Sequence, residues 1–302
     1  MTGNENAVPG EVVAGFDGSP ESWAAVRVAA WEAQRRGRSL TIVHGSSVQA
    51  AMEDVVAEVR GMLSDAAKHV AEAHPHLSVH TRLSAGGGAA TLVDVSRTAS
   101  LVVVGARGHG GFTGLSIGSV AAQTAAHATC PVMVIRGSSE SESPSAAASL
   151  SEDADSVEVP APGPVVVGVS RSDHDRAALD FAFEEATLRG VPVVGVHVWW
   201  FAKEVGESPD QYDEAVLDTA ARRVVADVMA DWLRRYPEVV VEHRPIRSMN
   251  PSATLIDESA HAGLVVVGCR GRGGFASLLL GSVGRDLIGH AEAPVTVVHD
   301  HT

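Results

Sequence analysis

Two stretches of the 302-residue chain carry the same order of an apolar run, a glycine-rich loop and a serine. They read LVVVGARGHGGFTGLSIGSV at residues 101–120 and LVVVGCRGRGGFASLLLGSV at residues 264–283. An apolar run before such a loop is typical of a buried strand, so the repeat predicts two strand, loop and helix units. Both follow the spacing Gly-x2-Gly-x9-Gly-Ser, at Gly105, Gly108, Gly118 and Ser119 and again at Gly268, Gly271, Gly281 and Ser282.

Loops of this kind suit phosphate groups. Without side chains, successive backbone N–H groups can turn toward an anion, and a helix N-terminus adds unpaired donors and a partial positive charge. We expect Ser119 and Ser282 at the helix starts, where the hydroxyl caps the helix or donates to a phosphate oxygen. Arg107, Arg270 and Arg272 add charged donors. The alternative is that the glycines only form a long surface turn, but a second copy of the loop at the same spacing disfavours this. A Walker loop is excluded because no Gly-Lys-Ser/Thr follows the glycines.

Strands and helices are predicted to alternate in both halves of the chain. Ser19 is expected to cap the first helix with Pro20 in its first position, and Gly37 to end it. In the first half we expect strands at 11–16, 40–44, 77–83 and 131–135, helices at 20–36, 50–73 and 90–98, and the strand, loop and helix of 101–127. The second half repeats this order, with strands at 165–169, 192–198, 239–244 and 294–298, helices at 173–189, 210–235 and 253–261, and the strand, loop and helix of 264–290.

This alternation of apolar strands and helices implies a doubly wound α/β fold in each half, a parallel sheet with helices on both faces. Ligands of such sheets collect at the carboxyl ends of the strands, where the strand order reverses. If the first and fourth strands are neighbours, Asp17 faces the loop at 105–119. Since a carboxylate repels phosphates, Asp17 is expected to accept hydrogen bonds from a ribose or a base. The pattern therefore predicts a nucleotide pocket.

The length predicts two domains, at 1–136 and 164–302, joined by a linker at 137–163. That linker is rich in Ser, Ala and Pro and has no apolar period, so a flexible spacer is favoured over a partner-binding or phosphorylated segment. The linker also contains six of the chain's acidic residues. The net charge of the whole chain is −14, and a negative charge argues against nucleic acid as a partner. Ten residues are inserted in the second half, around 199–209.

The composition points to a soluble, cytoplasmic protein. No apolar run approaches the ~18 residues of a membrane span, so we expect no membrane partner. The first residues, MTGNENAVPG, lack the pattern of a signal peptide. Two cysteines, Cys130 and Cys269, cannot build a disulfide framework.

These motifs resemble the universal stress protein family, and the chain looks like a tandem member with two ATP-binding domains. The matching residues are VVAGFDGSPES near the start, His44, LVVVGARGHGGF with Gly118-Ser119, and Cys130-Pro131-Val132. The resemblance covers about 11–136 and 164–299. It implies a Rossmann-like fold of the adenine nucleotide alpha-hydrolase type, with five parallel strands in the order 3-2-1-4-5. It also implies ATP as the ligand, with or without Mg²⁺, a regulatory role in the stress response, and a homodimer or an intramolecular pairing of the two domains.

The resemblance also implies which residues bind the nucleotide. Asp17 is assigned to the adenosine, Gly45 to the wall of the adenine pocket, and the glycine loop to the ribose and phosphates. The predicted set in the first domain is Gly15, Phe16, Asp17, Gly45, Val104, Gly105, Arg107, Gly108, Gly118, Ser119 and Val120. In the second domain it is Gly168, Ser170, Val198, Val267, Gly268, Gly271, Gly281, Ser282 and Val283.

One departure from the family pattern lies in the second domain. Ser170-Arg171-Ser172 stands where the first domain has Asp17-Gly18-Ser19, so a carboxylate acceptor is missing. A hydrogen bond to a charged group contributes about 1.5–3 kcal/mol, so its loss predicts binding weaker by about ten- to a hundredfold. Arg171 could compensate in part with a charged donor.

Three classes of function remain open. The residues favour a nucleotide-binding regulatory protein. A slow ATPase or phosphotransferase would need a positioned base and a metal site, and only His109 and Asp17 fall near the expected phosphates. A dimerisation module with vestigial loops is the third, because the fifth strands lie at sheet edges and could pair.

Six other residues have two interpretations each. His74, His76 and His80 are interpreted as solvated histidines rather than as metal ligands, because they lack the Cys or carboxylate spacing of a metal site. Cys269 in the second loop is interpreted as a small filler in the place of Ala106 rather than as a redox sensor. Trp199 and its neighbour Trp200 are expected to pack under the inserted loop rather than to stack on a base.

Overall fold

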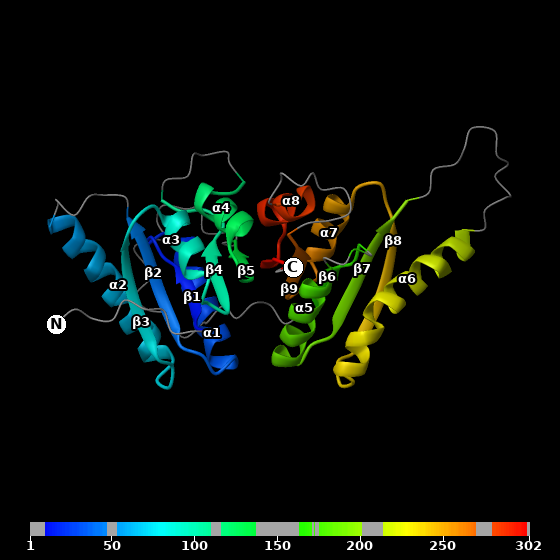
Figure 1. The fold of residues 1–302 in the computed structure, drawn as a ribbon, viewed down its shortest axis with the longest axis horizontal. Coiled ribbons are helices and arrows are strands. Elements are labelled where there is room, and N and C mark those ends of the chain that lie inside the picture. The colour runs from blue at the N-terminus through cyan, green and yellow to red at the C-terminus, as the bar shows by residue number, and fades with distance from the viewer. Residues whose placement is uncertain are drawn as a thin grey trace. The chain divides into compact units, whose positions relative to one another are not determined.

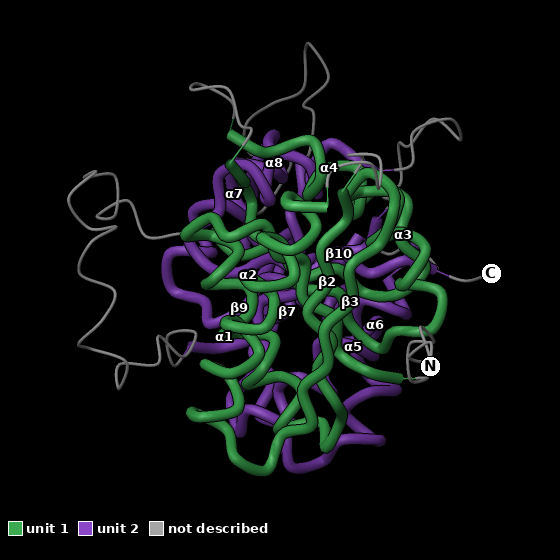
Figure 2. Tube along the Cα trace, turned by 90° about the vertical axis from the view of Figure 1, so that its left-hand side faces the viewer, with its two compact units in different colours: residues 1–161 green, residues 162–302 purple. Residues whose placement is uncertain are grey.

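The structure is a computed structural model that describes residues 10–46, 53–109, 116–136, 163–170, 172, 175–200, 214–269 and 280–300. The chain divides into two compact units, Met1–Ala161 and Pro162–Thr302, which Figure 2 shows in different colours. Each unit is an α/β fold built on parallel strands (Figure 1). No helix within these described ranges is long and apolar enough to cross a membrane.

The first unit alternates strand and helix along its whole described length. Its strands are β1 (Val12–Gly15), β2 (Leu40–Ser46), β3 (Val79–Ala85), β4 (Leu101–Gly105) and β5 (Val132–Ile135). Its helices are α1 (Pro20–Arg35), α2 (Glu53–Ala73), α3 (Gly88–Val95) and α4 (Ser119–His127). The strands are parallel in the order β3-β2-β1-β4-β5, which confirms the order expected from the family.

Strand β1 is the centre of this sheet. It pairs with β2 on one side, where Val13 lies opposite Thr41, and with β4 on the other, where Val13 lies opposite Val102. Val12, Val13 and Ala14 are fully buried, because helices cover both faces of the sheet. The chain moves from β1 outward to β3 and then crosses back to β4. Since β-α-β connections are right-handed, this reversal carries α3 and α4 to the face opposite α1 and α2.

The second unit repeats this architecture. Its strands are β6 (Val165–Gly168), β7 (Val193–Trp199), β8 (Val241–Arg247), β9 (Leu264–Gly268) and β10 (Val295–Val298). Its helices are α5 (Asp175–Arg189), α6 (Glu214–Arg235), α7 (Pro251–Ser259) and α8 (Ser282–His290). The strand order is β10-β9-β6-β7-β8, the same arrangement with β6 at the centre.

The predicted start of the first helix is confirmed. Ser19 is the N-cap of α1, and its Oγ accepts a hydrogen bond from the N–H of Ser22 at 3.2 Å. Pro20 takes the first turn, where its missing N–H costs nothing. The helix ends at Arg35, and Gly37 follows at φ +59°, a left-handed conformation that glycine adopts readily.

Several predicted boundaries were wrong by a few residues. Strand β3 begins at Val79 and not at Leu77, because Leu77 belongs to the turn after α2, where its N–H donates to His74 O at 3.0 Å. Both β2 and β3 extend beyond prediction because their pairing continues to Ser46 and Ala85. Residues 50–52, 173–174 and 210–213, expected to be helical, lie outside the described residues, as does nearly all of the predicted linker.

The prediction that Ser119 and Ser282 lie at the helix starts is confirmed, but of the two roles open to their hydroxyls the capping role is not the one observed. The N-cap residues are Gly118 and Gly281, which make no side-chain cap hydrogen bond, and each serine is the first helical residue. The start of each helix is therefore left without a side-chain acceptor from its cap residue.

Candidate functional site

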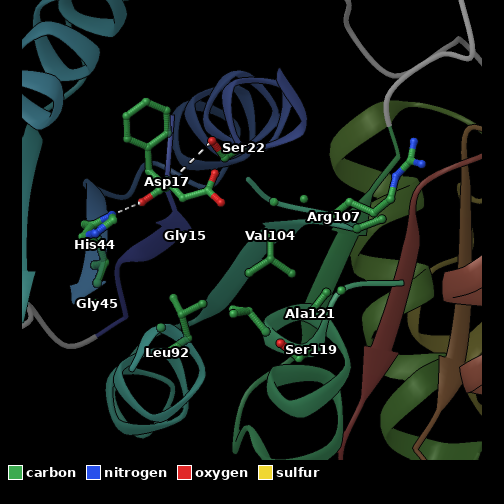
Figure 3. A pocket seen from close by; sticks show the side chains of 18 of the residues that line it. Gly15, Asp17, Ser22, His44, Gly45, Leu92, Val104, Arg107, Ser119 and Ala121 are labelled. Atoms are coloured by element: carbon green, nitrogen blue, oxygen red, sulfur yellow. Dashed lines mark hydrogen bonds between the residues drawn. The ribbon is translucent and has the colours of Figure 1, made fainter. Parts of the chain in front are cut away.

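A pocket of about 520 Å³ opens in the first unit at the carboxyl ends of β1, β2 and β4, where the strand order reverses (Figure 3). All the residues predicted for the first domain line it: Gly15, Phe16, Asp17, Gly45, Val104, Gly105, Arg107, Gly108, Gly118, Ser119 and Val120. The topology brings them together from three strand ends and the start of α4. Further lining residues were not in the predicted set: Ser22, Val43, His44, Gly88, Leu92, Ala106, Ile117 and Ala121.

Asp17 follows β1 and is held by the turn that begins α1. Its Oδ1 accepts hydrogen bonds from Ser19, from the N–H at 3.0 Å and from the hydroxyl at 2.6 Å. Its Oδ2 accepts a hydrogen bond from the backbone N–H of His109 at 3.1 Å. Burial raises the pKa of Asp17, but the hydrogen bonds from Ser19, His109 and Ser22 outweigh it and lower that pKa below its ordinary value. Asp17 is therefore a carboxylate at neutral pH.

Gly108 lets the loop after β4 approach that carboxylate. A Cβ placed on Gly108 would lie 2.2 Å from Asp17 Oδ2, closer than any real contact, so a side chain here would force the carboxylate or the loop to move. The imidazole of His109 also lies beside the carboxylate, with its Nδ1 3.9 Å from Asp17 Oδ1. The close contact between Gly108 and Asp17 therefore brings the loop after β4 against the turn after β1 at the edge of the pocket.

The wall at the end of β2 is made of backbone and apolar side chains. A Cβ on Gly45 would lie 2.8 Å from Gly88 Cα and 2.7 Å from Thr91 Oγ1, so the close approach of β2 to the start of α3 leaves no room for a side chain at position 45. Leu92 and Val104 complete the apolar side of the pocket (Figure 3). Such a surface suits the flat face of a ring.

His44 supports this wall from within. Its Nδ1 lies 2.8 Å from Phe16 O, which ties the end of β2 to the turn after β1. The second unit repeats the bond, with His197 Nδ1 2.8 Å from Val169 O. We interpret these histidines as structural in both units.

The start of α4 turns N–H groups that have no acceptor within the helix toward the opposite side of the pocket. The first intrahelical bond runs from Ala122 N to Gly118 O at 3.0 Å, so the helix offers no acceptor for the N–H groups of Ser119, Val120 and Ala121. All three residues line the pocket. Gly118 itself donates to Ala106 O at 2.7 Å, which folds the ends of the glycine loop together. The arrangement suits an anion.

Arg107 lines the pocket but is engaged elsewhere. Its Nε lies 3.3 Å from Glu21 Oε1, and Figure 3 shows its side chain pointing away from Asp17 and Ser119. Arg136 belongs to the same group of charges, where burial and the nearby Arg107 lower its pKa. The predicted contact of Arg107 with a phosphate would require its side chain to leave Glu21.

The described residues of the second unit repeat part of this arrangement. Gly281 N donates to Cys269 O at 2.8 Å, and the first bond of α8 runs from Arg285 N to Gly281 O at 3.1 Å, as in the first unit. Gly168, Val267 and Gly268 lie at the ends of β6 and β9, and Ser282 and Val283 in the first turn of α8. Gly271, Arg171, Arg270 and Arg272 lie outside the described residues.

A carboxylate that was not predicted from the sequence, Asp175, lies in the first turn of α5, the first helix of the second unit. Asp175 stands five residues after Ser170, as Ser22 stands five residues after Asp17. Its Oδ2 accepts from Ser170 N at 2.7 Å and from Ser172 N at 3.2 Å, and its Oδ1 accepts from Ser170 Oγ at 2.7 Å. No sequence signal marked it, because acidic residues are common in the first turn of any helix.

Three other residues of the sequence analysis can be placed. Cys269 is 5% exposed, in the position that the equally buried Ala106 has in the first unit. Trp199 and Trp200 lie at the end of β7, where the Arg247 guanidinium carbon is 6.0 Å and 5.7 Å from their ring centroids. The inserted loop expected to cover them lies outside the described residues. Among the residues that are described, no group of three or more His, Cys, Asp or Glu could hold a metal ion.

These features define a tandem pair of Rossmann-like α/β units, at least one with a ligand pocket at the reversal of its strand order. The model of the universal stress protein family matches residues 10–136 and 163–299, and the chain belongs to this family. The universal stress protein Rv2623 of Mycobacterium tuberculosis is 36% identical over 303 residues, covering 96% of either chain. The universal stress protein Rv2005c of the same organism is 34% identical over 300 residues, covering 95% of this chain and 96% of its own.

The fold is also seen in a solved structure. The crystal structure of a universal stress protein from Archaeoglobus fulgidus superposes with a TM-score of 0.66 over 96% of this chain and 98% of its own. The sequences are 17% identical, so this likeness concerns the fold. It extends over both units.

Proposed function

We propose that the first unit binds ATP and that the chain is a regulatory stress protein whose shape or choice of partner depends on the bound nucleotide. One observation carries the proposal. A single pocket joins the partly exposed carboxylate of Asp17, an apolar wall at Gly45 and Leu92, and the N–H groups of Ser119 and Val120, for which α4 itself has no acceptor. These are the groups needed for a ribose, a base and a phosphate.

The size and the free acceptors of the pocket fit this ligand. Its volume of about 520 Å³ lies within the range of roughly 300–1,000 Å³ usual for cofactor sites. An ionised carboxylate has about four acceptor positions, and Ser19 and His109 occupy only some of those on Asp17. A ribose hydroxyl can use the remainder, since the Asp17 side chain is 38% exposed.

Mg²⁺ would be held mainly by the nucleotide. The described part of the chain offers no cluster of metal ligands, so the phosphates and water would supply most of the coordination. The protein's own contribution is to orient the anion at the start of α4. We place the protein in the cytoplasm, where ATP is abundant.

The test is to recover nucleotide from the purified full-length protein. After heat denaturation, chromatography and mass spectrometry should detect an adenine nucleotide. Adding ATP to nucleotide-free protein at a hundred times its Kd should stabilise the first unit by about 2.7 kcal/mol, which raises its Tm by roughly 5–10 °C. No adenine compound and no thermal shift would refute the proposal. Steady release of ADP would favour the slow ATPase.

We also propose self-association through the fifth strands, β5 and β10, either within one chain or between two chains. Exposed strand edges carry unpaired backbone donors and acceptors. Light scattering with size-exclusion chromatography distinguishes the two cases. A monomer mass is expected for pairing within one chain, and twice the 31.3 kDa of one chain for a homodimer.

A further inference from the structure

An ion pair between Arg107 and Glu21 joins the glycine loop of the first unit to helix α1. Arg107 Nε lies 3.3 Å from Glu21 Oε1, and the two side chains are 44% and 16% exposed. Among the described residues that line the pocket, Arg107 is the only Arg or Lys, yet its side chain is directed away from Asp17 and Ser119 (Figure 3). The cation of the pocket is therefore engaged by a carboxylate that does not line the pocket.

Gly105 fixes the position of Glu21. A Cβ on Gly105 would lie 2.8 Å from the carbonyl carbon and 2.8 Å from the Cβ of Glu21. The first turn of α1 therefore packs directly on the end of β4, and a side chain at position 105 would push it away. Because Arg107 follows Gly105 by two residues, the same contact brings the carboxylate to the guanidinium. Gly105 thus has a packing role besides its predicted role at the phosphates.

A second guanidinium lies close to the same carboxylate. Arg136 follows β5, the strand that pairs with β4. Burial and repulsion by Arg107 lower the pKa of Arg136, whereas attraction by Glu21 acts to raise it. One carboxylate is thus surrounded by two guanidinium groups, and the group of three carries a net positive charge. When Arg107 moves away, Arg136 still compensates the charge of the partly buried Glu21, which reduces the cost of separating the pair.

The Arg107 side chain starts beside the place expected for the phosphates. A Cβ on Gly118, the N-cap of α4, would lie 3.5 Å from Arg107 Cα. Rotation about the bonds of this long side chain can therefore carry the guanidinium from Glu21 to an anion near the start of α4. The N–H groups of the helix start suit a single phosphate group. A longer phosphate chain has further anionic oxygens, for which arginine is a strong and often bidentate partner.

We infer, on the basis of the proposed function, that Arg107 exchanges Glu21 for the phosphate chain of a nucleoside triphosphate and that this exchange distinguishes ATP from AMP. The single phosphate of AMP is held at the start of α4 and leaves Arg107 paired with Glu21. The two further phosphates of ATP attract Arg107 away from Glu21, which keeps Arg136 nearby. Glu21 is therefore a competitor of the phosphate chain, and it lowers the affinity for ATP without affecting the affinity for AMP.

The experiment measures the Kd of ATP and of AMP for the nucleotide-free full-length protein by isothermal titration calorimetry. Arg107→Gln should weaken ATP binding by at least about tenfold, since it removes a charged hydrogen-bond donor, and should leave the Kd of AMP within about twofold. Glu21→Gln should strengthen ATP binding by about fivefold, the upper end for an ion pair of this exposure, and leave AMP unchanged. Equal changes for both nucleotides would overturn the inference. If wild type bound neither nucleotide, the proposed function itself would fail.

A double variant tests whether Glu21 acts through Arg107. When Glu21→Gln is added to Arg107→Gln, the Kd of ATP should stay within about twofold, because the group that Glu21 engages is already absent. A fivefold gain that persists without Arg107 would mean simple repulsion between Glu21 and the phosphates, and the inference would be overturned.

Asp94→Asn is the matched control for a change of charge. It removes a carboxylate that is 66% exposed, belongs to the first unit and does not line the pocket. The Kd of both nucleotides should stay within about twofold of wild type. A gain in ATP affinity equal to that of Glu21→Gln would indicate a general effect of net charge and would also overturn the inference. Circular dichroism reports whether each variant is folded.

Discussion

Asp17 accepts a hydrogen bond at Oδ2 from the backbone N–H of His109, at 3.1 Å, across the two strand ends that form the pocket. The bond connects the turn after β1 with the loop after β4. One carboxylate thus positions the glycine loop and remains exposed to a ligand. Removing it should change both the binding of nucleotide and the stability of the first unit.

Asp17→Ala is expected to weaken ATP binding by about ten- to a hundredfold, because a hydrogen bond to a charged group contributes about 1.5–3 kcal/mol. Calorimetric titration measures the effect. The matched control is Asp180→Ala, which removes an exposed carboxylate bonded to Trp232 and Arg235 in the second unit. An equal loss in both variants would show that the effect is not local to the pocket.

The stability of the protein should depend on the ionisation of Asp17. Its pKa is lower in the folded protein than its ordinary value of 3.8, so folding favours the ionised form. The resulting stability is fully present above the unfolded pKa and is lost as the pH falls through the folded one. The Tm of wild type should exceed that of Asp17→Asn most above about pH 5, and the difference should shrink below about pH 4. A difference that grows toward low pH would contradict the lowered pKa.

Gly108→Ala should damage the pocket severely. The new Cβ would lie 2.2 Å from Asp17 Oδ2, so the loop or the carboxylate must move. Overpacking of this kind costs about 1–3 kcal/mol of unfolding free energy, and ATP affinity should fall at least tenfold. Gly61→Ala in α2 is the control, since its Cβ meets nothing within 4 Å. It should raise the stability by up to about 1 kcal/mol and leave affinity unchanged.

Gly118→Ala should have a milder effect than Gly108→Ala. Gly118 has an ordinary φ of −76°, and its Cβ would lie 3.3 Å from Ala106 O, so the loop must yield by only a few tenths of an ångström. We expect an intact fold and a reduced ATP affinity, because the methyl group shifts the backbone beside the first N–H groups of α4, which have no acceptor within the helix. Circular dichroism and titration separate the two effects. A loss of folding larger than that of Gly108→Ala would contradict this geometry.

The strands and helices could be predicted from the sequence because their two signals, continuous apolar runs and helix-start residues, are local. Runs such as Val102 to Val104 are apolar on both faces, which only a buried parallel strand requires, and Ser19 with Pro20 mark a helix start. The strand order came from the resemblance to the family, since pairing between distant strands leaves no local trace. Boundaries such as Ser46 were missed because they depend on the partner strand.

Pocket residues could be predicted only where the residue type itself indicates a binding role, as a carboxylate or a glycine in a loop does. Asp17 and the glycines did so. Leu92 and Val43 line the pocket as ordinary apolar residues of a helix and a strand, and their positions follow from tertiary packing. Asp175 could not be distinguished from any acidic residue at a helix start. It is nevertheless a carboxylate hydrogen-bonded to Ser170, the residue that stands where the first unit has Asp17. The pairing of Arg107 with Glu21 likewise depends on how α1 packs on β4.

The two cysteines should resist thiol reagents in the folded protein. Burial raises the pKa of Cys130 to about 12, so only about one thiol in ten thousand is ionised at pH 8, and the thiolate is the reactive form. Cys269 is protected by its burial, since it is 5% exposed and a reagent cannot reach the sulfur. A disulfide-exchange reagent at pH 8 should therefore modify neither residue in native protein and both in guanidinium chloride. Rapid modification of Cys269 alone in the native state would revive its reading as a redox sensor in the second glycine loop. If ATP then slowed that modification, the second unit would bind nucleotide after all.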